Sequence, residues 1–253
     1  MTKPTVLITG GATRIGGALS RGFAKAGWHV VIHYKSSSDP AEQLAAQLPS
    51  AEIVQCDLSD PQAAKAMMEE LTKRLSDWRC VINSASVFDY DDANNIDTAT
   101  FDAAITINAH SPALMSQTYF ANAQSSNLRC TIQITDMKLE NSNPDFFSYT
   151  MSKHALAATI PMLAKDVSGA GDRVYGIAPG AILASHDQKE EEIDVSHLLN
   201  LLKRKTDASE IVDAALFLAS GTLKSGSTMF IDSGQHLLNQ PRDVIYLARE
   251  QAD

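Results

Sequence analysis

Short apolar runs alternate with longer amphipathic segments along most of the 253 residues. Most of the runs are continuous rather than alternating, which is typical of strands covered on both faces of a parallel sheet. They lie at 5–9, 29–34, 52–57, 79–85, 129–135, 173–179 and 227–232. Helical patterns lie near 15–26, 61–75, 101–123, 148–168 and 208–219. This alternation predicts one Rossmann-type α/β domain over 1–253, a doubly wound parallel sheet with helices on both faces.

Two segments depart from the alternation. The first, 180–206, follows the sixth apolar run and is long, charged and partly helical. Connections of this length are usually functional lids or disordered segments, and this one leaves the carboxyl end of a strand, where doubly wound sheets bind ligands. We therefore expect 180–206 to be a substrate lid. The second, 235–253, predicts a C-terminal helix or arm that serves packing or assembly rather than chemistry.

The composition narrows the class of protein. A hydrophobic content of 44%, with 20% charged residues, is typical of a soluble globular chain, and the formal charge of −9 argues against a nucleic-acid partner. We find no apolar run long enough for a membrane span and no signal peptide, so we expect a cytoplasmic protein. The three cysteines lack metal or redox spacing, so we expect buried thiols and no metal site.

A glycine-rich turn follows the first apolar run, in TVLITGGATRIGGAL. Gly10 and Gly11 allow a tight turn, and Gly16 lets the following helix pack close to the sheet with its N-terminus facing a phosphate. No Lys-Ser/Thr pair follows the last glycine, which excludes a P-loop. A glycine turn alone can be structural, but between a strand and a helix it predicts a dinucleotide site.

The residues around this turn favour NADPH over NADH. Arg14 occupies a position that often holds glycine, and its guanidinium can form a bidentate pair of hydrogen bonds to a phosphate. The second strand ends in His33, Tyr34, Lys35, Ser36 and Ser37, without the acidic residue that usually binds the NAD ribose. Cationic and hydroxyl groups here favour a 2′-phosphate, although a solvated turn is the alternative.

Two further strand ends carry candidate cofactor contacts. Asp57 ends the third strand and can accept a hydrogen bond from the adenine amino group, although an N-cap role before Pro61 competes. The small polar residues of INSAS (82–86) end the fourth strand and let the backbone approach the cofactor ribose.

Tyr149 and Lys153 stand four residues apart, so they share one face of the predicted helix. A lysine cation near a phenol favours the phenolate, so we expect Lys153 to lower the pKa of Tyr149 from its usual value near 10. Lys153 can also donate to the nicotinamide ribose. Asp136 lies 13 residues before Tyr149, directly after an apolar run. Such a tyrosine–lysine pair alone is also found as a structural feature of exposed helices.

Taken in order, these motifs resemble the short-chain dehydrogenase/reductase family over nearly the whole chain. The matching stretches are TGGATRIG (9–16), CDL (56–58), NSAS (83–86), TINAHSP with Asn108, YTMSK (149–153), PG (179–180) and IDSG (231–234). The resemblance implies that Tyr149 donates a proton, that Lys153 is its electrostatic partner and that Asn108 supports a water-linked proton path. It also implies a homo-oligomer, commonly a tetramer, through helices near 101–123 and 148–168.

Three positions depart from the family pattern. Ser84 replaces an asparagine, Arg14 replaces a glycine, and Asp136 stands where the family usually has a catalytic serine. That serine donates to a substrate carbonyl as it becomes an alkoxide, which an ionised carboxylate would repel. A C=N bond fits better, because its nitrogen takes a proton and ring N–H groups need an acceptor. We hypothesise that Asp136 marks a nitrogen heterocycle as substrate, the alternative being a turn cap.

The same substitutions make the chain similar to the pteridine reductases and the related bacterial dihydromonapterin reductases. This likeness rests on TGxxxRxG (9–16), HYKSS (33–37), NSASVF (83–88) and the spacing of Asp136, Tyr149 and Lys153. It implies that Phe88 stacks on a flat pterin against the nicotinamide, although core packing is an alternative for an aromatic residue after a strand.

The sequence therefore predicts an NADPH-dependent reductase of a small-molecule substrate with a pterin-type C=N bond. Alternatives are a generic ketone, alcohol or 3-oxoacyl reductase, and a catalytically silent NADP-sensing protein. The expected catalytic residues are Asp136, Tyr149, Lys153 and Asn108, and the expected substrate contacts are Arg14, Ser86, Phe88, Asp136 and Tyr149. The expected cofactor contacts are Gly10, Arg14, Ile15, Gly16, His33, Tyr34, Lys35, Ser36, Asp57, Leu58, Asn83, Ala85, Ser86, Thr135, Tyr149, Lys153, Pro179, Gly180 and Ile182.

Overall fold

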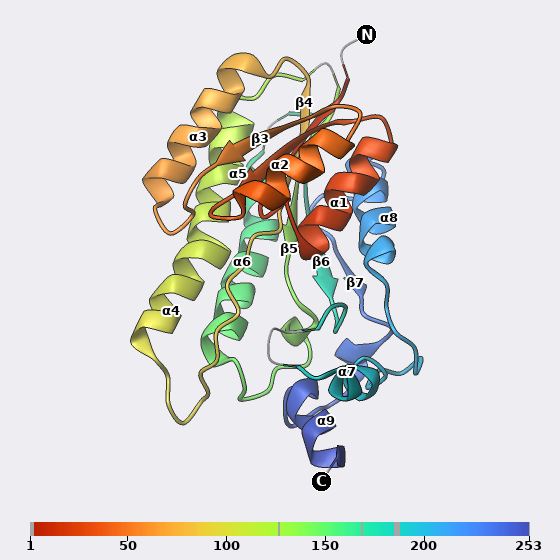
Figure 1. The fold of residues 1–253 in the computed structure, drawn as a ribbon. Coiled ribbons are helices and arrows are strands. Elements are labelled where there is room, and N and C mark those ends of the chain that lie inside the picture. The colour runs from red at the N-terminus through yellow and green to blue at the C-terminus, as the bar shows by residue number, and fades with distance from the viewer. Residues whose placement is uncertain (1–2, 126, 168, 185–187, 253) are drawn as a thin grey trace.

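The computed structural model describes residues 3–125, 127–167, 169–184 and 188–252. Within them, seven strands form one parallel sheet in the order β3-β2-β1-β4-β5-β6-β7 (Figure 1). The strands are β1 (Thr5–Ile8), β2 (His29–Tyr34), β3 (Ala51–Gln55), β4 (Trp78–Asn83), β5 (Arg129–Ile134), β6 (Asp172–Pro179) and β7 (Thr228–Ile231). Each apolar run that predicted a strand overlaps one, and the strand begins within one residue of the start of the run, which confirms the predicted fold class.

Helices connect the strands and extend beyond the last one. They are α1 (Arg14–Lys25), α2 (Ser38–Gln47), α3 (Pro61–Arg74), α4 (Thr98–Ile105), α5 (Ser111–Asn122), α6 (Phe147–Asp166), α7 (Glu190–Ser196), α8 (Ala208–Ala219) and α9 (Val244–Ala252). Short 3₁₀ turns span Met137–Leu139 and Gln235–Leu237. Among the described residues, no helix is both long and apolar enough to cross a bilayer.

Two helices differ from the sequence-based expectation. The single helix predicted over 101–123 is instead α4 and α5, joined by a π-helical turn at Thr106–His110. The helix α2 was not predicted, because it buries only Ala41 and Leu44 and so leaves too short an apolar stripe to read from the pattern.

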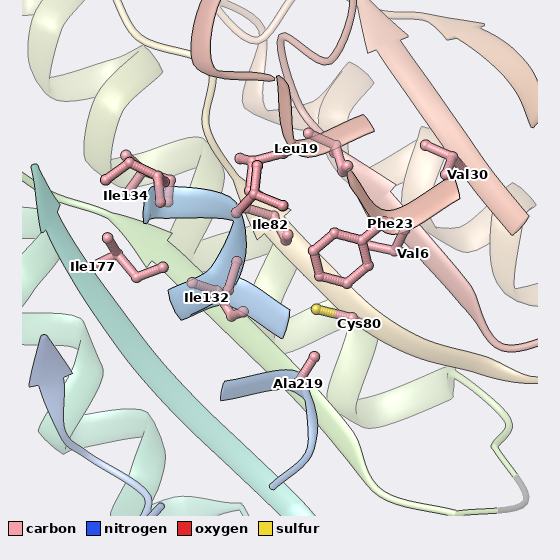
Figure 2. Packing of buried hydrophobic residues seen from close by; sticks show 14 of the residues in the cluster. Val6, Leu19, Phe23, Val30, Cys80, Ile82, Ile132, Ile134, Ile177 and Ala219 are labelled. Carbon is pink, nitrogen blue, oxygen red and sulfur yellow. The ribbon is translucent and has the colours of Figure 1, made fainter. Parts of the chain in front are cut away.

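Both faces of the sheet are covered, which explains why the strands are apolar throughout. On one face, Val6 and Ile8 pack against α1, α2 and α8; on the other, Leu7 packs against α3 and α5. Figure 2 shows Phe23 of α1 among the strand side chains of the first cluster. The predicted burial of all three cysteines is confirmed, and each is a free thiol.

The functional end of the molecule follows from this topology. Successive strands run outward from β1 to β3, and the chain then crosses back to place β4 on the other side of β1. At such a reversal, the loops that leave neighbouring strands diverge and open a crevice beyond the carboxyl ends of the strands. The loops after β1, β4 and β5 meet there.

Candidate functional site

A cavity of about 630 Å³ lies at the carboxyl ends of the strands. Its walls come from the loops that follow β1 to β6, from the expected lid segment and from the C-terminal arm. The predicted site residues that line it are Gly10, Arg14, Ile15, Gly16, His33, Tyr34, Lys35, Ser36, Asp57, Leu58, Ala85, Ser86, Phe88, Thr135, Asp136, Tyr149, Lys153, Pro179, Gly180 and Ile182. Two predicted residues, Asn83 and Asn108, are not among the lining residues.

The glycine turn has a backbone shape that side chains would block. Gly10 has a φ of 61°, and a Cβ added to Gly16 would come within 2.1 Å of the Gly10 carbonyl oxygen. Arg14 also has a positive φ, 50°, which explains why related chains can hold a glycine at this position. Its guanidinium donates a 2.8 Å hydrogen bond to the Ala184 carbonyl. Arg14 therefore joins the turn to the start of the expected lid.

His33, at the end of β2, contacts the glycine turn. Its ring is buried and accepts a 3.2 Å hydrogen bond at Nδ1 from the Gly10 amide, while Nε2 lies 3.0 Å from the Cys56 carbonyl. Burial lowers the pKa of His33 to about 4. A neutral ring with its hydrogen on Nε2 satisfies both contacts. His33 therefore supports the glycine turn and adds no positive charge to the site.

Lys35 and Asp57 form an ion pair at the outer end of the cavity. Lys35 Nζ lies 2.9 Å from Asp57 Oδ2, and both side chains are exposed. The backbone amide of Ser59 and then Lys35 hold the pKa of Asp57 at about 2. Asp60, not Asp57, caps α3 through the amides of Gln62 and Ala63. The competing N-cap role of Asp57 is therefore wrong, and Asp57 remains available to a ligand.

Asp136 and Tyr149 form the centre of the site. The Tyr149 hydroxyl donates a 2.6 Å hydrogen bond to Asp136 Oδ2, while Oδ1 accepts a 2.9 Å bond from the Lys138 amide. Asp136 thus caps the 3₁₀ turn at Met137–Leu139 and also faces the tyrosine, so the two alternatives for this residue are compatible. Burial raises the pKa of the Asp136 carboxyl, against the hydrogen bond from Tyr149.

The expected effect of Lys153 on Tyr149 is wrong. Burial and then the Asp136 carboxylate raise the pKa of Tyr149 well above its usual value, because a phenol that donates to a carboxylate keeps its proton. Lys153 Nζ donates a 2.8 Å bond to the Ile134 carbonyl and lies 5.5 Å from the Tyr149 ring centroid. Burial lowers the pKa of Lys153 to about 8. The site therefore holds a neutral phenol near a carboxyl group and near the Lys153 ammonium, which is mostly protonated at neutral pH.

Phe88 lies against the tyrosine at the cavity wall. Its ring stacks on Phe146 with centroids 4.1 Å apart, and it meets Tyr149 edge to face at 4.6 Å. The side chain is 38% exposed. Phe88 is therefore partly core packing, as the alternative expected, and partly an open aromatic surface beside the catalytic pair.

Asn83 and Asn108 do not line the cavity, and their side chains bond to residues around it. The Asn108 amide accepts from the Val87 amide at 2.9 Å and donates to the Val87 carbonyl and the Ser152 hydroxyl. It thereby fixes the loop that carries Phe88 against α6. The Asn83 side chain bonds to Gln133 and Ser116, so only the backbone of Asn83 is left for the expected approach to the cofactor ribose.

Although the sequence predicted that 180–206 lies over the substrate, it identified no residue after Ile182 in this segment, and none in the C-terminal arm, that lines the cavity. Gln188, Ser196 and His197 line it from the 180–206 segment, of which 185–187 lie outside the described residues. Asp243, Val244 and Ile245 line it from the C-terminal arm, which was expected to serve packing or assembly. No sequence signal reveals these contacts, because the short run VIYL resembles any terminal helix.

Comparison with solved structures places the chain near reductases of the same shape. The crystal structure of FolM alternative dihydrofolate reductase 1 from Brucella suis, in complex with NADP, has a TM-score of 0.87 and 28% identity. The match covers 94% of this chain and 96% of that one. The Brucella canis FolM structure, complexed with NADP, matches with the same TM-score and identity.

Curated relatives carry other activities in their names. A probable galactose dehydrogenase from Rhizobium meliloti is 27% identical over 239 residues, with 90% of this chain and 93% of the relative covered. A 7alpha-hydroxysteroid dehydrogenase from Escherichia coli is 29% identical over 244 residues, covering 90% and 92%. These sequences support the broad family without selecting a pterin substrate.

The sequence model described as enoyl-(acyl carrier protein) reductase matches residues 10–236, which is most of the chain. The matched range begins in the glycine turn and includes the Asp136, Tyr149 and Lys153 positions. The chain therefore belongs to the short-chain dehydrogenase/reductase family, as the order of its motifs predicted.

Proposed function

We propose that this protein is an NADPH-dependent reductase of a pterin-type C=N bond, converting a dihydropterin to its tetrahydro form. The observation that carries the proposal is the 2.6 Å hydrogen bond between the Tyr149 hydroxyl and the Asp136 carboxylate, beside Phe88 in the cavity. A carboxylate at this point disfavours an alkoxide but accepts hydrogen bonds from ring N–H groups. The likeness to two FolM alternative dihydrofolate reductases supports the same substrate class.

The cavity fits NADPH. The turn at Gly10–Gly16 leads into α1, so its backbone would hold a pyrophosphate at the N-terminus of that helix. Arg14 and Lys35 are exposed cations on the same wall and would hold a 2′-phosphate. Lys153 would bind the nicotinamide ribose. The two FolM neighbours hold NADP. When bound, NADPH supplies a hydride to the ring carbon.

The chain's own groups supply the proton that the ring nitrogen needs. Because the pKa of Tyr149 is raised, the phenol carries its proton at neutral pH. When a substrate N–H group donates to Asp136, the phenol is released to turn toward the ring nitrogen. Asp136 is hydrogen-bonded to the oxygen of this phenol. Because the pKa of Asp136 is raised, its carboxyl group can take a proton from solvent and pass it to the resulting phenolate. Lys153 stabilises that phenolate from the other side.

Steady-state consumption of NADPH with 7,8-dihydropterins tests the proposal. General acid catalysis contributes about 10²- to 10⁴-fold, so we expect Tyr149→Phe and Asp136→Asn each to lower kcat by roughly that range. Lys73→Met is a matched surface control, because Lys73 forms an exposed ion pair with Glu70 on α3, outside the cavity. Unchanged turnover in either site variant would contradict the assigned roles.

A second candidate is a reductase of a ketone, alcohol or 3-oxoacyl thioester. The named activities of the galactose and hydroxysteroid dehydrogenases favour it, since those relatives are as similar to this chain as the FolM structures. Parallel assays with 3-oxoacyl thioesters, a steroid ketone and dihydropterins separate the two. Binding of NADPH without turnover of any of these would favour an NADP-sensing protein instead.

A further inference from the structure

The C-terminal arm, residues 235–252, folds back over the catalytic end of the molecule. Figure 1 shows α9 beside α7, below the sheet, and Arg249 of α9 lies 3.1 Å from Glu192 of α7. At the start of α9, Ile245 packs in one cluster with Phe146 and Tyr149. The arm therefore packs in the same hydrophobic cluster as the tyrosine that the proposed reaction uses.

A buried lysine holds this end of the arm. Lys138 has a side chain only 3% exposed, and its Nζ lies 2.8 Å from Asp243 Oδ2. The same nitrogen donates to Asn143 Oδ1 at 3.0 Å and to the Asp145 carbonyl at 3.2 Å, and lies 5.5 Å from the Phe146 ring centroid. A buried cation is stable only with such partners, so this contact has a defined geometry.

Asp243 fixes the position of the arm through its bonds to neighbouring residues. Its Oδ1 accepts a 3.0 Å bond from the Ile245 amide, while its own amide donates to Asp145 Oδ2 at 2.8 Å. Arg242 forms a further ion pair with Asp145. Asp243 therefore ties the first turn of α9 to the loop before α6 through its amide and to Lys138 through its carboxylate.

Lys138 also contacts the catalytic carboxyl group from its backbone. Its amide donates to Asp136 Oδ1, and the other oxygen of Asp136 accepts from Tyr149. One residue thus links Asp136 through its amide and the arm through its amine. The surrounding charged groups are Asp136, Asp145, Asp243, Arg242 and Lys153.

We propose that Lys138 and Asp243 are a positioning pair that holds Asp243, Val244 and Ile245 as a wall of the substrate pocket. The C-terminal arm is then a specificity-determining element, whose first turn lines the pocket that the flat heterocycle would occupy. This inference rests on the proposed function for the identity of the substrate. The position of the arm does not depend on the proposed function.

Kinetics test the role of the pair in substrate binding. Loss of binding that is equal in the ground and transition states raises KM and leaves kcat unchanged, so we expect Asp243→Asn and Lys138→Met to raise the dihydropterin KM about tenfold at nearly constant kcat. The Kd for NADPH should stay within about twofold, because the cofactor turn lies elsewhere in the cavity. Lys73→Met is the matched control. An unchanged KM in both site variants overturns the proposal.

Hydrogen exchange tests the arm without any substrate. In Asp243→Asn, amides of 243–250 should exchange faster than in the wild type, while those of α1 should not change. Ile245→Ala serves if a buried-charge variant fails to fold, since it truncates the wall and leaves the ion pair intact, and it should raise KM alone. If the amides of 243–250 exchange as slowly in Asp243→Asn as in the wild type, and Ile245→Ala keeps the wild-type KM, the inference is overturned. Absence of dihydropterin turnover with fast exchange in Asp243→Asn overturns only the proposed function, because the arm role then stands for another substrate.

Discussion

Replacement of Asp136 by serine should exchange the preferred substrate. The change restores the hydroxyl that the family usually carries and removes a charge 2.6 Å from the Tyr149 hydroxyl. A serine oxygen can still accept from the Lys138 amide, which Asp136 Oδ1 now does at 2.9 Å, so the turn that follows should keep its shape.

The magnitude follows from the charge that the carboxylate sets against an alkoxide. A unit charge about 4 Å from a developing oxyanion, at an effective dielectric of about 20, costs about 4 kcal/mol. Each 1.36 kcal/mol corresponds to about tenfold in rate, so removal of the charge should raise kcat/KM for a ketone by up to about 10³-fold. The dihydropterin should lose a factor of about 10² to 10⁴, because its nitrogen loses the returned proton and the N–H acceptor.

The assay compares kcat/KM for a 7,8-dihydropterin and for a 3-oxoacyl thioester in wild type and Asp136→Ser. Asp136→Asn separates the two effects, since it removes the charge without supplying a hydroxyl. We expect it to lose dihydropterin turnover and to gain less ketone turnover than the serine variant. Wild-type dihydropterin turnover in Asp136→Ser, with no gain on the thioester, would refute the electrostatic reasoning.

Three further changes test the supporting structure. The pKa of His33 is lowered to about 4 in the folded protein, so the unfolded chain binds the proton more tightly, and the free energy of unfolding of the wild type should fall by about 3 kcal/mol as pH drops from about 6.5 to about 4. Urea unfolding of His33→Asn should lack this pH dependence. A pH dependence equal to that of the wild type would exclude His33 as its source. The same linkage applies to Lys153, whose lowered pKa makes wild-type stability rise between about pH 8 and 10.5, whereas Lys153→Met should show no such rise and little turnover. Asp60→Ala removes the cap of α3 and should cost about 1 kcal/mol, seen as a Tm lower by about 2–4 °C at full activity; an unchanged Tm would contradict the capping role.

Local pattern alone predicted the architecture and half of the site. Continuous apolar runs predicted every strand of the described sheet, because a strand covered on both faces has no side exposed to solvent and so carries apolar residues throughout. The glycine turn and the Tyr149–Lys153 spacing also follow from local geometry, since a tight turn and one helical turn each fix their own residues. Asp136 was identified because it departs from a family pattern at a known position.

Burial and long-range contact decided the rest. The protonation states of His33 and Tyr149 depend on which groups the fold places around them, so the sequence did not reveal the neutral ring of His33 and wrongly predicted a lowered pKa for Tyr149. The wall formed by Asp243 depends on Lys138, which is more than a hundred residues earlier in the chain. Sequence patterns carry information over one or two helical turns, whereas desolvation and ion pairing are set by neighbours in space. The sequence by itself therefore determined the sheet and the cofactor turn, and only the tertiary structure decided the charge states and the closure of the pocket.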